Sequence, residues 1–215
     1  MKKYHINEQK KLLKLLKKNK TFAISNTLVQ YMYNDIEKLS THINETTSKD
    51  IACRKGCTYC CNSRVEIAQP EAIFIYSYIK NTLNQEQLES IFNKIKEIVS
   101  LTSQISDQND YNKLQLPCIF LNNNLCGIYE IRPFICREFH SVNLESCEDN
   151  YVKFKENSGA IQSINIKNSY YRILNSYGKI YRESNLEFTS NEFMSSLLKI
   201  HEDPNYIKDY FRNSK

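Results

Sequence analysis

The chain has 215 residues, which is enough to bury a hydrophobic core without help from a metal. With no tryptophan, four glycines and four prolines, it is poor in turn-forming residues, and this favours long helices. The formal net charge is +5, but residues 1–20 hold eight lysines against Glu8, a net +7, so residues 21–215 sum to −2. A nucleic-acid binder usually carries a basic surface on the fold itself, so this near-neutral body argues against nucleic acid as a partner.

The first twenty residues have no apolar run longer than two residues, and no later segment approaches the length of a membrane span. We therefore expect no transmembrane segment and a cytoplasmic location. In a reducing compartment, metal binding explains clustered cysteines better than disulfides do. The lysine-rich N-terminus is typical of a solvated helix face; contact with an anionic membrane or RNA is the alternative.

An N-terminal helical segment is predicted over residues 1–48. Helical periodicity runs over residues 7–48, with a break or bend at residues 19–21. The apolar positions of this pattern are Leu12, Leu13, Leu16, Leu28, Val29, Met32, Ile36 and Leu39.

Two further helices are predicted after the first group of cysteines. Pro70 and Glu71 are typical of the first two helical positions, because proline lacks the N–H that the first turn leaves unpaired. Asn84 and Gln87 form a capping box ahead of a second apolar face over residues 88–99. The short connection predicts that the two helices form a hairpin.

Helical periodicity is lost over residues 107–124, where LQLPCIFL has the character of a short strand. C-terminal helices are predicted over residues 160–213, with tyrosines at helical spacing and with Thr189 and Glu192 as a capping box. The tyrosine spacing favours core packing over base stacking. No domain boundary is visible, so we expect a single domain over residues 1–215. Its expected fold class is mainly α, with helix hairpins around a cysteine-rich loop region stapled by metal.

All the cysteines of the chain lie within residues 53–147. Thiols at intervals of two to four residues, as in CRKGCTYCC, can be turned by a short loop onto one point, as a tetrahedral metal or an iron–sulfur cluster requires. We therefore predict a cysteine-cluster metal-binding core over residues 53–147. Its candidate metal ligands are Cys53, Cys57, Cys60, Cys61, Cys118, Cys126, Cys136 and Cys147.

The spacing leaves the metal open, since all-thiolate ligation suits both zinc and an iron–sulfur cluster. The eight thiols make two four-thiolate zinc sites, or one cluster with four ligands and four other thiols. Cys60 and Cys61 are adjacent and point in different directions in most backbone conformations. They therefore serve different metal ions, or only one of them is a ligand.

Glycines and a histidine lie beside the cysteines. Gly56 precedes Cys57 and Gly127 follows Cys126, and glycine permits the sharp turns that aim backbone N–H groups at sulfur. His140 is interpreted as a surface or supporting group rather than a ligand, because thiols are plentiful.

Cations also lie beside the cysteines. They can neutralise the negative charge of bound thiolates. Arg132 and Arg137 can alternatively grip the carboxylate or phosphate of a substrate, or pair with Glu130 and Glu138 on the surface. The full set of nearby cations is Arg54, Lys55, Arg64, Arg132 and Arg137.

Three boxes of the sequence resemble the YkgJ-type CxxCxxCC cysteine-cluster family of zinc- or iron-chelating domains. They are Gly-Cys-x-x-Cys-Cys at residues 56–61, Pro-Cys-x-Phe-Leu at 117–121 and Cys-x-Ile-Tyr-x-x-Arg-Pro-x-x-Cys-Arg-x-Phe at 126–139. The resemblance implies a metal-site role for the six cysteines inside the boxes, with Cys53 and Cys147 at flanking positions. Cys53 and Cys57 are separated by three residues, where the name of the family implies two.

The resemblance leaves three functions open. The first is a helical metal-binding protein with no substrate that the sequence identifies. The second is an iron–sulfur enzyme that transfers a methyl group to protein lysine, because the family includes the flagellin lysine N-methylases. Those proteins are longer, however, and this chain has no glycine-rich nucleotide loop. The third is a metal-handling or redox-sensing role, and no catalytic or cofactor-binding residue can be assigned.

Overall fold

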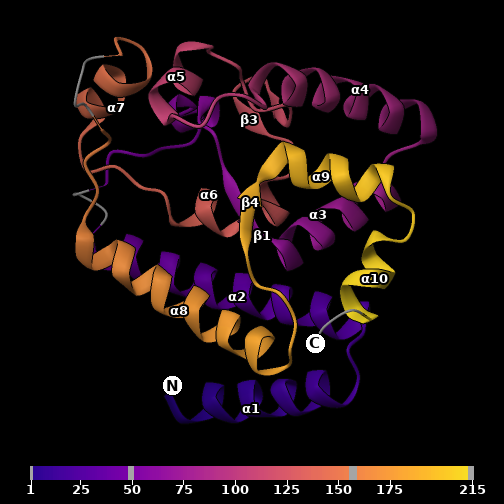
Figure 1. Ribbon diagram of the computed structural model, residues 1–215. Coiled ribbons are helices and arrows are strands. Elements are labelled where there is room, and N and C mark those ends of the chain that lie inside the picture. Colours follow the sequence, from indigo (N-terminus) through magenta and orange to yellow (C-terminus); the bar gives the residue numbers. More distant parts are fainter. Residues whose placement is uncertain (1, 48–50, 155–158, 213–215) are drawn as a thin grey trace.

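The computed structural model describes residues 2–47, 51–154 and 159–212 (Figure 1). These residues form helices for most of their length, together with small two-stranded antiparallel sheets. The predicted mainly α fold is confirmed. Within this described part of the chain, no helix combines the length and apolar character needed to cross a membrane.

The N-terminal segment and the tyrosine-rich helix pack together at one end of the molecule (Figure 1). They are α1 (Lys2–Lys18), α2 (Phe22–Thr47) and α8 (Ile164–Glu183). The predicted break at residues 19–21 is confirmed. Tyr177 and Tyr181 are buried, and their hydroxyls bond Asp35 and Ser25 of α2 at 2.8 and 2.9 Å. The tyrosine spacing therefore serves core packing, as expected.

A second group of helices consists of α3 (Gln69–Thr82), α4 (Gln85–Thr102) and α9 (Phe193–Glu202). The Asn84–Gln87 capping box is confirmed, with reciprocal bonds of 2.9 and 3.1 Å. The consecutive helices α3 and α4 both pack against α9, rather than mainly against each other (Figure 1). Its His201 ring stacks on Phe92 of α4 with ring centroids 3.8 Å apart.

The structure corrects three local predictions. Thr189 does not cap α9; Glu192 does, with its carboxylate accepting the N–H groups of Met194 and Ser195. A short helix, α5 (Gln108–Lys113), occupies part of the segment predicted to lack helix, and Asp107 caps it. Pro70 lies one position later in α3 than predicted, since the helix begins at Gln69.

One small sheet joins the C-terminal part of the chain to the cysteine region. Strand β1 (Glu66–Ala68) pairs antiparallel with β4 (Ser190–Glu192), so that Ile67 lies opposite Asn191. Because β1 directly follows the first cysteine group, this pairing fixes the position of the chain at the C-terminal end of that group. A further helix, α10 (Tyr206–Arg212), follows α9.

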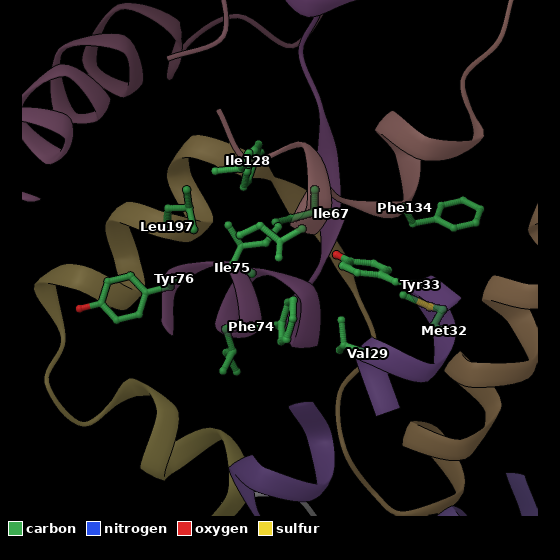
Figure 2. Close-up of a cluster of buried hydrophobic side chains, with 14 of the residues drawn as sticks. Val29, Met32, Tyr33, Ile67, Phe74, Ile75, Tyr76, Ile128, Phe134 and Leu197 are labelled. Atoms are coloured by element: carbon green, nitrogen blue, oxygen red, sulfur yellow. The ribbon is translucent and has the colours of Figure 1, made fainter. Parts of the chain in front are cut away.

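The hydrophobic core connects the helices to the cysteine region (Figure 2). Ile73, Ile75 and Leu197 are fully buried at its centre. Ile128 and Phe134, from the segment that carries the later cysteines, belong to the same cluster. The cysteine region is therefore anchored by side chains that contribute to the main core.

Candidate metal centre

The first cysteine group lies in a tight turn followed by a short 3₁₀ helix, η2 (Tyr59–Asn62). The Cys57 N–H bonds the carbonyl of Arg54 at 3.0 Å, and the Cys61 N–H bonds that of Thr58 at 2.9 Å. Gly56 has φ +85°, a conformation that glycine adopts without steric cost. The predicted structural role of Gly56 therefore has a clear basis in backbone conformation.

The second cysteine group consists of Cys118 and Cys126. Cys118 precedes a hairpin of β2 (Leu121–Asn122) and β3 (Leu125–Cys126), in which Cys126 is opposite Leu121. The connecting residues, Asn123 and Asn124, both have positive φ, as a tight hairpin turn requires. The Cys118 N–H donates to the carbonyl of Cys61 at 2.8 Å. This bond brings the first and second groups together across a long stretch of sequence.

Gly127 has a different role from Gly56. Its N–H bonds the Phe120 carbonyl at 2.7 Å, and a Cβ atom added there would lie 3.2 Å from that oxygen. The reason for glycine at this position is close approach of two backbone segments rather than a positive φ. The side of the hairpin next to Cys126 is thereby held against the segment that follows Cys118.

Cys136 lies on α6 (Phe134–Glu138), a short helix that follows η3 (Tyr129–Ile131). The Glu71 carboxylate of α3 accepts the backbone N–H of Phe134 at 2.7 Å and the hydroxyl of Tyr33 at 3.0 Å. It also accepts the Ala68 N–H at 3.3 Å. A fully buried carboxylate therefore fixes the start of the helix that presents Cys136.

The two flanking cysteines lie in different settings, Cys53 beside Ser141 and Cys147 on a helix that packs against η2. The Ser141 N–H points at the sulfur of Cys53 at 3.2 Å, while the Ala52 N–H bonds the Ser141 carbonyl at 2.7 Å. Cys147 is buried in α7 (Leu144–Tyr151), which packs against η2. The packing of α7 on η2 therefore brings the helix that carries Cys147 against the helix that carries Cys60 and Cys61.

His140 is buried and not on the surface. Its Nε2 accepts the Ser163 N–H at 3.1 Å, so its Nδ1 donates to the Glu138 carbonyl, 3.0 Å away. Both ring nitrogens are used in bonds to the backbone, which leaves neither available as a metal ligand in this arrangement. Of the two interpretations from the sequence, a surface group or a supporting group, the buried position excludes the first.

Backbone N–H groups are aimed at the sulfurs of two further cysteines. Burial raises the pKa of Cys118 to about 12, while an N–H from Phe120 lowers it. Burial also raises the pKa of Cys126, and an N–H from Ile128 opposes this rise. Such bonds stabilise thiolates, and they are typical of the turns that hold zinc and iron–sulfur centres.

The thiols of Cys61, Cys118, Cys126 and Cys136 lie within electrostatic reach of one another. Desolvation raises the pKa of Cys136, and the charges of the other three thiolates raise it further. Cys118 and Cys126 also interact with each other, and both interact with Cys61. Every pair among these four residues therefore interacts.

Cys60 and Cys61 form a hydrogen-bonded pair. The Cys60 thiol donates to the sulfur of Cys61, which lowers the pKa of Cys61 to about 7 and raises that of Cys60. The two side chains therefore lie in contact, in contrast to the expectation that they point in different directions. The short 3₁₀ helix that carries both residues permits this contact.

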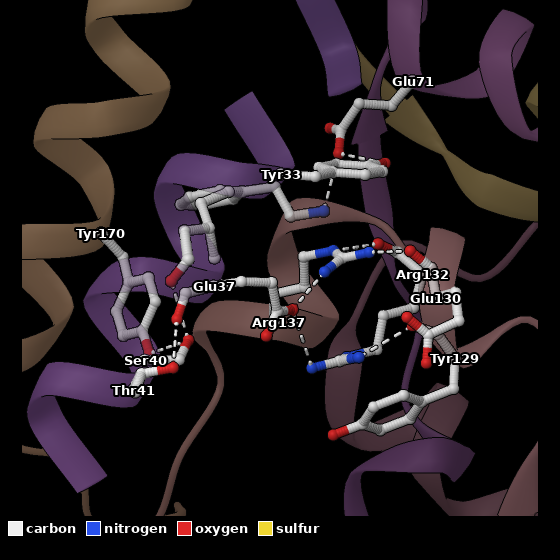
Figure 3. A network of polar contacts seen from close by, with 12 residues as sticks. Tyr33, Glu37, Ser40, Thr41, Glu71, Tyr129, Glu130, Arg132, Arg137 and Tyr170 are labelled. Atoms are coloured by element: carbon white, nitrogen blue, oxygen red, sulfur yellow. Dashed lines mark hydrogen bonds and ion pairs between the residues drawn. The ribbon is translucent and has the colours of Figure 1, made fainter. Parts of the chain in front are cut away.

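Arg132 and Arg137 lie close together in a network of polar contacts that includes Glu37 (Figure 3). The Arg137 side chain is buried against the Tyr33 ring, its Nε bonds the Arg132 carbonyl at 2.7 Å, and its other nitrogens reach Glu130 O and the Glu37 carboxylate. Arg132 lies 3.6 Å from the same carboxylate. Their acidic partner is therefore Glu37 of α2, and neither arginine pairs with the side chains expected from the sequence.

The positive charges of Arg132 and Arg137 lower the pKa values of nearby cysteine thiols. Arg132 opposes the rise in the pKa of Cys136 that burial and the neighbouring thiolates cause. Arg132 and Arg137 both oppose the rise for Cys126, which is caused first by burial. The predicted neutralising role of these two cations is therefore consistent with their positions.

The donors present fit a thiophilic metal by chemistry, since thiolates suit zinc and iron–sulfur centres. In the part of the chain that the structure describes, however, no three cysteine, histidine, aspartate or glutamate side chains converge closely enough to hold one ion. A change of one cysteine rotamer moves its sulfur by about 3 Å. Ligation therefore requires side-chain rotation on a backbone that already brings the cysteines together.

The residues that hold this arrangement were missed by the sequence analysis, with Glu71 interpreted only as a helix start. Tyr33 and Glu37 lie on α2, and their spacing in the sequence predicts only that they share one face of a helix. Nothing local in the sequence connects them to cysteines a hundred residues later. A glutamate at the first turn of a helix, inside an otherwise apolar segment, is the one signal that points to Glu71.

The fold and site together define a mainly α protein with a cysteine-rich loop region built for thiolate chemistry. Residues 52–158 match the family model CxxCxxCC, described as a "putative zinc- or iron-chelating domain". This part of the chain belongs to that family, and it contains all eight cysteines. Metal binding is therefore its class of function. Comparisons with curated proteins and with solved structures give no match.

Proposed function

We propose that this protein binds zinc, or iron in an iron–sulfur cluster, through thiolates of its clustered cysteines in the cytoplasm. The observation that carries the proposal is that all eight cysteines lie within residues 52–158, the segment that matches the model of a zinc- or iron-chelating domain. Within this segment the thiolates of Cys61, Cys118, Cys126 and Cys136 lie within electrostatic reach of one another and repel, and a bound cation removes that cost. The proposed ligand set is Cys53, Cys57, Cys60, Cys61, Cys118, Cys126, Cys136 and Cys147.

The surroundings of the thiols support the proposal. Cys53, Cys118 and Cys126 each receive a backbone N–H at sulfur, which favours the thiolate that a metal needs. Arg132 and Arg137 supply positive charge beside the site. A reducing compartment keeps such thiols free for a metal, and this is the basis for proposing a cytoplasmic location.

Elemental analysis and a visible spectrum of protein purified anaerobically, without added metal, test the proposal. We expect zinc without colour, or iron with acid-labile sulfide and broad visible absorption. Cys118→Ser is expected to lower the metal content, and His42→Gln, on the exposed face of α2, provides the matched control. Wild-type protein without metal, or equal loss in both variants, would contradict the proposal.

A further inference from the structure

A cavity of about 280 Å³ lies next to the cysteine region, and the proposed function makes no use of it. Its walls come from β1, β4, α3, α6 and α8, together with Arg64, which lies between the first cysteine group and β1. We propose that this cavity binds a small monocarboxylate with an apolar body, and that the guanidinium of Arg64 holds the carboxylate. The inference goes beyond the proposed function, since none of the candidate metal ligands lines the cavity.

Arg64 is the cation of the cavity. Its Nη1 donates to the carbonyl of Ile105, and its Nε is buried without a hydrogen-bond partner among the described residues. Because Nη1 is occupied, the edge of Nε and Nη2 remains, and this edge of a guanidinium takes a carboxylate through two parallel hydrogen bonds. A buried N–H without an acceptor is costly, so an acceptor supplied by a ligand stabilises Arg64 where it lies.

Apolar side chains form a large part of the wall. Phe134 and Ile135 of α6 and Leu174 of α8 line the same cavity as Arg64. The Phe134 ring packs edge-on against the Tyr171 ring, with centroids 5.3 Å apart and planes at 82°. The backbone of Phe134 is held as well, by the bond from its N–H to the Glu71 carboxylate. The apolar wall is therefore preformed, and apolar lining with few polar groups is typical of small-molecule sites.

The charges in the lining favour a monoanion over a dianion. Glu66 and Glu71 line the cavity together with Arg64, so one guanidinium is set against two carboxylates. The Glu71 carboxylate already accepts hydrogen bonds from two backbone N–H groups and a tyrosine hydroxyl, and Glu66 is exposed, where solvent screens its charge. A single carboxylate therefore meets little repulsion, whereas a phosphate group adds a second negative charge.

The volume of the cavity limits the size of the ligand. Pockets that hold drug-sized molecules have volumes of about 300–1,000 Å³, and this cavity lies at the lower end of that range. It suits an acid with one ring or one branched chain rather than a nucleotide. The hydroxyls of Tyr171 and Ser190, which also line the cavity, can bond a polar substituent of such an acid.

Isothermal titration calorimetry with phenylacetate tests the proposal on the protein as purified, with phenylacetamide and phenyl phosphate as matched probes. We expect phenylacetate to bind at millimolar concentration or below. The amide, which lacks the charge, should bind about tenfold more weakly, and the phosphate should bind more weakly than the acid. The absence of phenylacetate binding, equal binding of the acid and the amide, or tighter binding of the phosphate would each overturn the proposal.

Variants locate the binding. Arg64→Gln should weaken phenylacetate binding by about tenfold or more, whereas Arg172→Gln, at an exposed position of α8 outside the lining, should leave it unchanged. Ser190→Phe adds an aromatic ring at an exposed position of β4, where strands accept such residues, and should block the cavity. It keeps the bond between Arg64 and Ile105, so it tests the site even where Arg64→Gln fails to fold. Unchanged binding in Ser190→Phe would refute the site.

Metal content separates this inference from the proposed function. Arg64→Gln and Ser190→Phe should contain as much metal as the wild-type protein, because every candidate ligand is intact. Loss of metal together with loss of probe binding in both variants would contradict the separate cavity site. Wild-type protein that binds phenylacetate but contains no metal would refute the proposed function alone.

Discussion

The carboxylate of Glu71 accepts the backbone N–H of Phe134 at 2.7 Å, although the two residues are 63 positions apart in the chain. Glu71 lies in the first turn of α3, and Phe134 begins the short helix that carries Cys136. A buried side chain of the helical core therefore sets the position of one candidate ligand. The candidate metal centre is attached to the core at this point.

Replacement of Glu71 by alanine is expected to destabilise the metal-free protein strongly. The change leaves the N–H groups of Phe134 and Ala68 and the hydroxyl of Tyr33 without their acceptor inside the core. Each such buried donor costs about 1–3 kcal/mol, so we expect a loss of about 3–5 kcal/mol in the free energy of unfolding. Urea denaturation measures it, and Glu66→Ala, at an exposed site on β1, is the control.

Arg137→Lys is expected to destabilise the fold, although it keeps the positive charge. A lysine cannot bond the Arg132 and Glu130 carbonyls and Glu37 at once, and it loses the flat contact with Tyr33. We expect a loss of about 2 kcal/mol. A thermal melt shows the effect, with Arg172→Lys on the exposed face of α8 as the comparison. Equal melting temperatures for the two variants would count against the described role.

Cys61 is expected to be the most reactive thiol of the metal-free protein near neutral pH. The hydrogen bond from Cys60 lowers its pKa to about 7, whereas burial raises that of Cys118 to about 12. Because the thiolate is the reactive form, iodoacetamide should modify Cys61 first at pH 7. Cys60→Ala should slow this reaction by removal of the donor. Peptide mass spectrometry follows both, and faster labelling of Cys118 would disprove the assignment.

His201 should make stability depend on pH. Burial lowers its pKa below 6.5; Glu202 acts in the opposite direction and Lys80 in the same one. The unfolded chain then binds more protons than the folded one around and below pH 6.5, so the free energy of unfolding falls as the pH drops through that range. In His201→Leu this part of the fall should disappear, whereas His42→Gln should keep it. Urea midpoints from pH 8 to pH 5 provide the comparison.

Elements with strong local signals were predictable from the sequence. The Asn84–Gln87 capping box and the interruption at residues 19–21 each depend on a few neighbouring residues, and both were found as predicted. The start of α9 was placed wrongly because Thr189 and Glu192 have the spacing of a capping box. Strand β4 pairs with β1 and runs from Ser190 to Glu192, so Thr189 precedes the strand and the helix begins only after Glu192. That choice depends on a partner more than a hundred residues away.

The candidate site was predictable in composition but not in connectivity. Clustered cysteines indicate a metal whatever their arrangement in space, so the list of thiols follows from spacing alone. The bond between Cys118 and Cys61 depends on tertiary folding, and the contact between Cys60 and Cys61 depends on a 3₁₀ helix that the spacing does not predict. The network of Glu37 with Arg132 and Arg137 likewise joins α2 to a distant loop. The single domain over residues 1–215 stays a prediction.

X-ray absorption at the edge of the bound metal, on protein purified anaerobically, tests the central claim most directly. The account predicts a first shell made of sulfur, with four metal–sulfur distances of about 2.3 Å for each zinc. Iron should show a sulfur shell as well, with iron neighbours beyond it if a cluster is present. A first shell of nitrogen and oxygen atoms would contradict the claim that the clustered cysteines hold the metal.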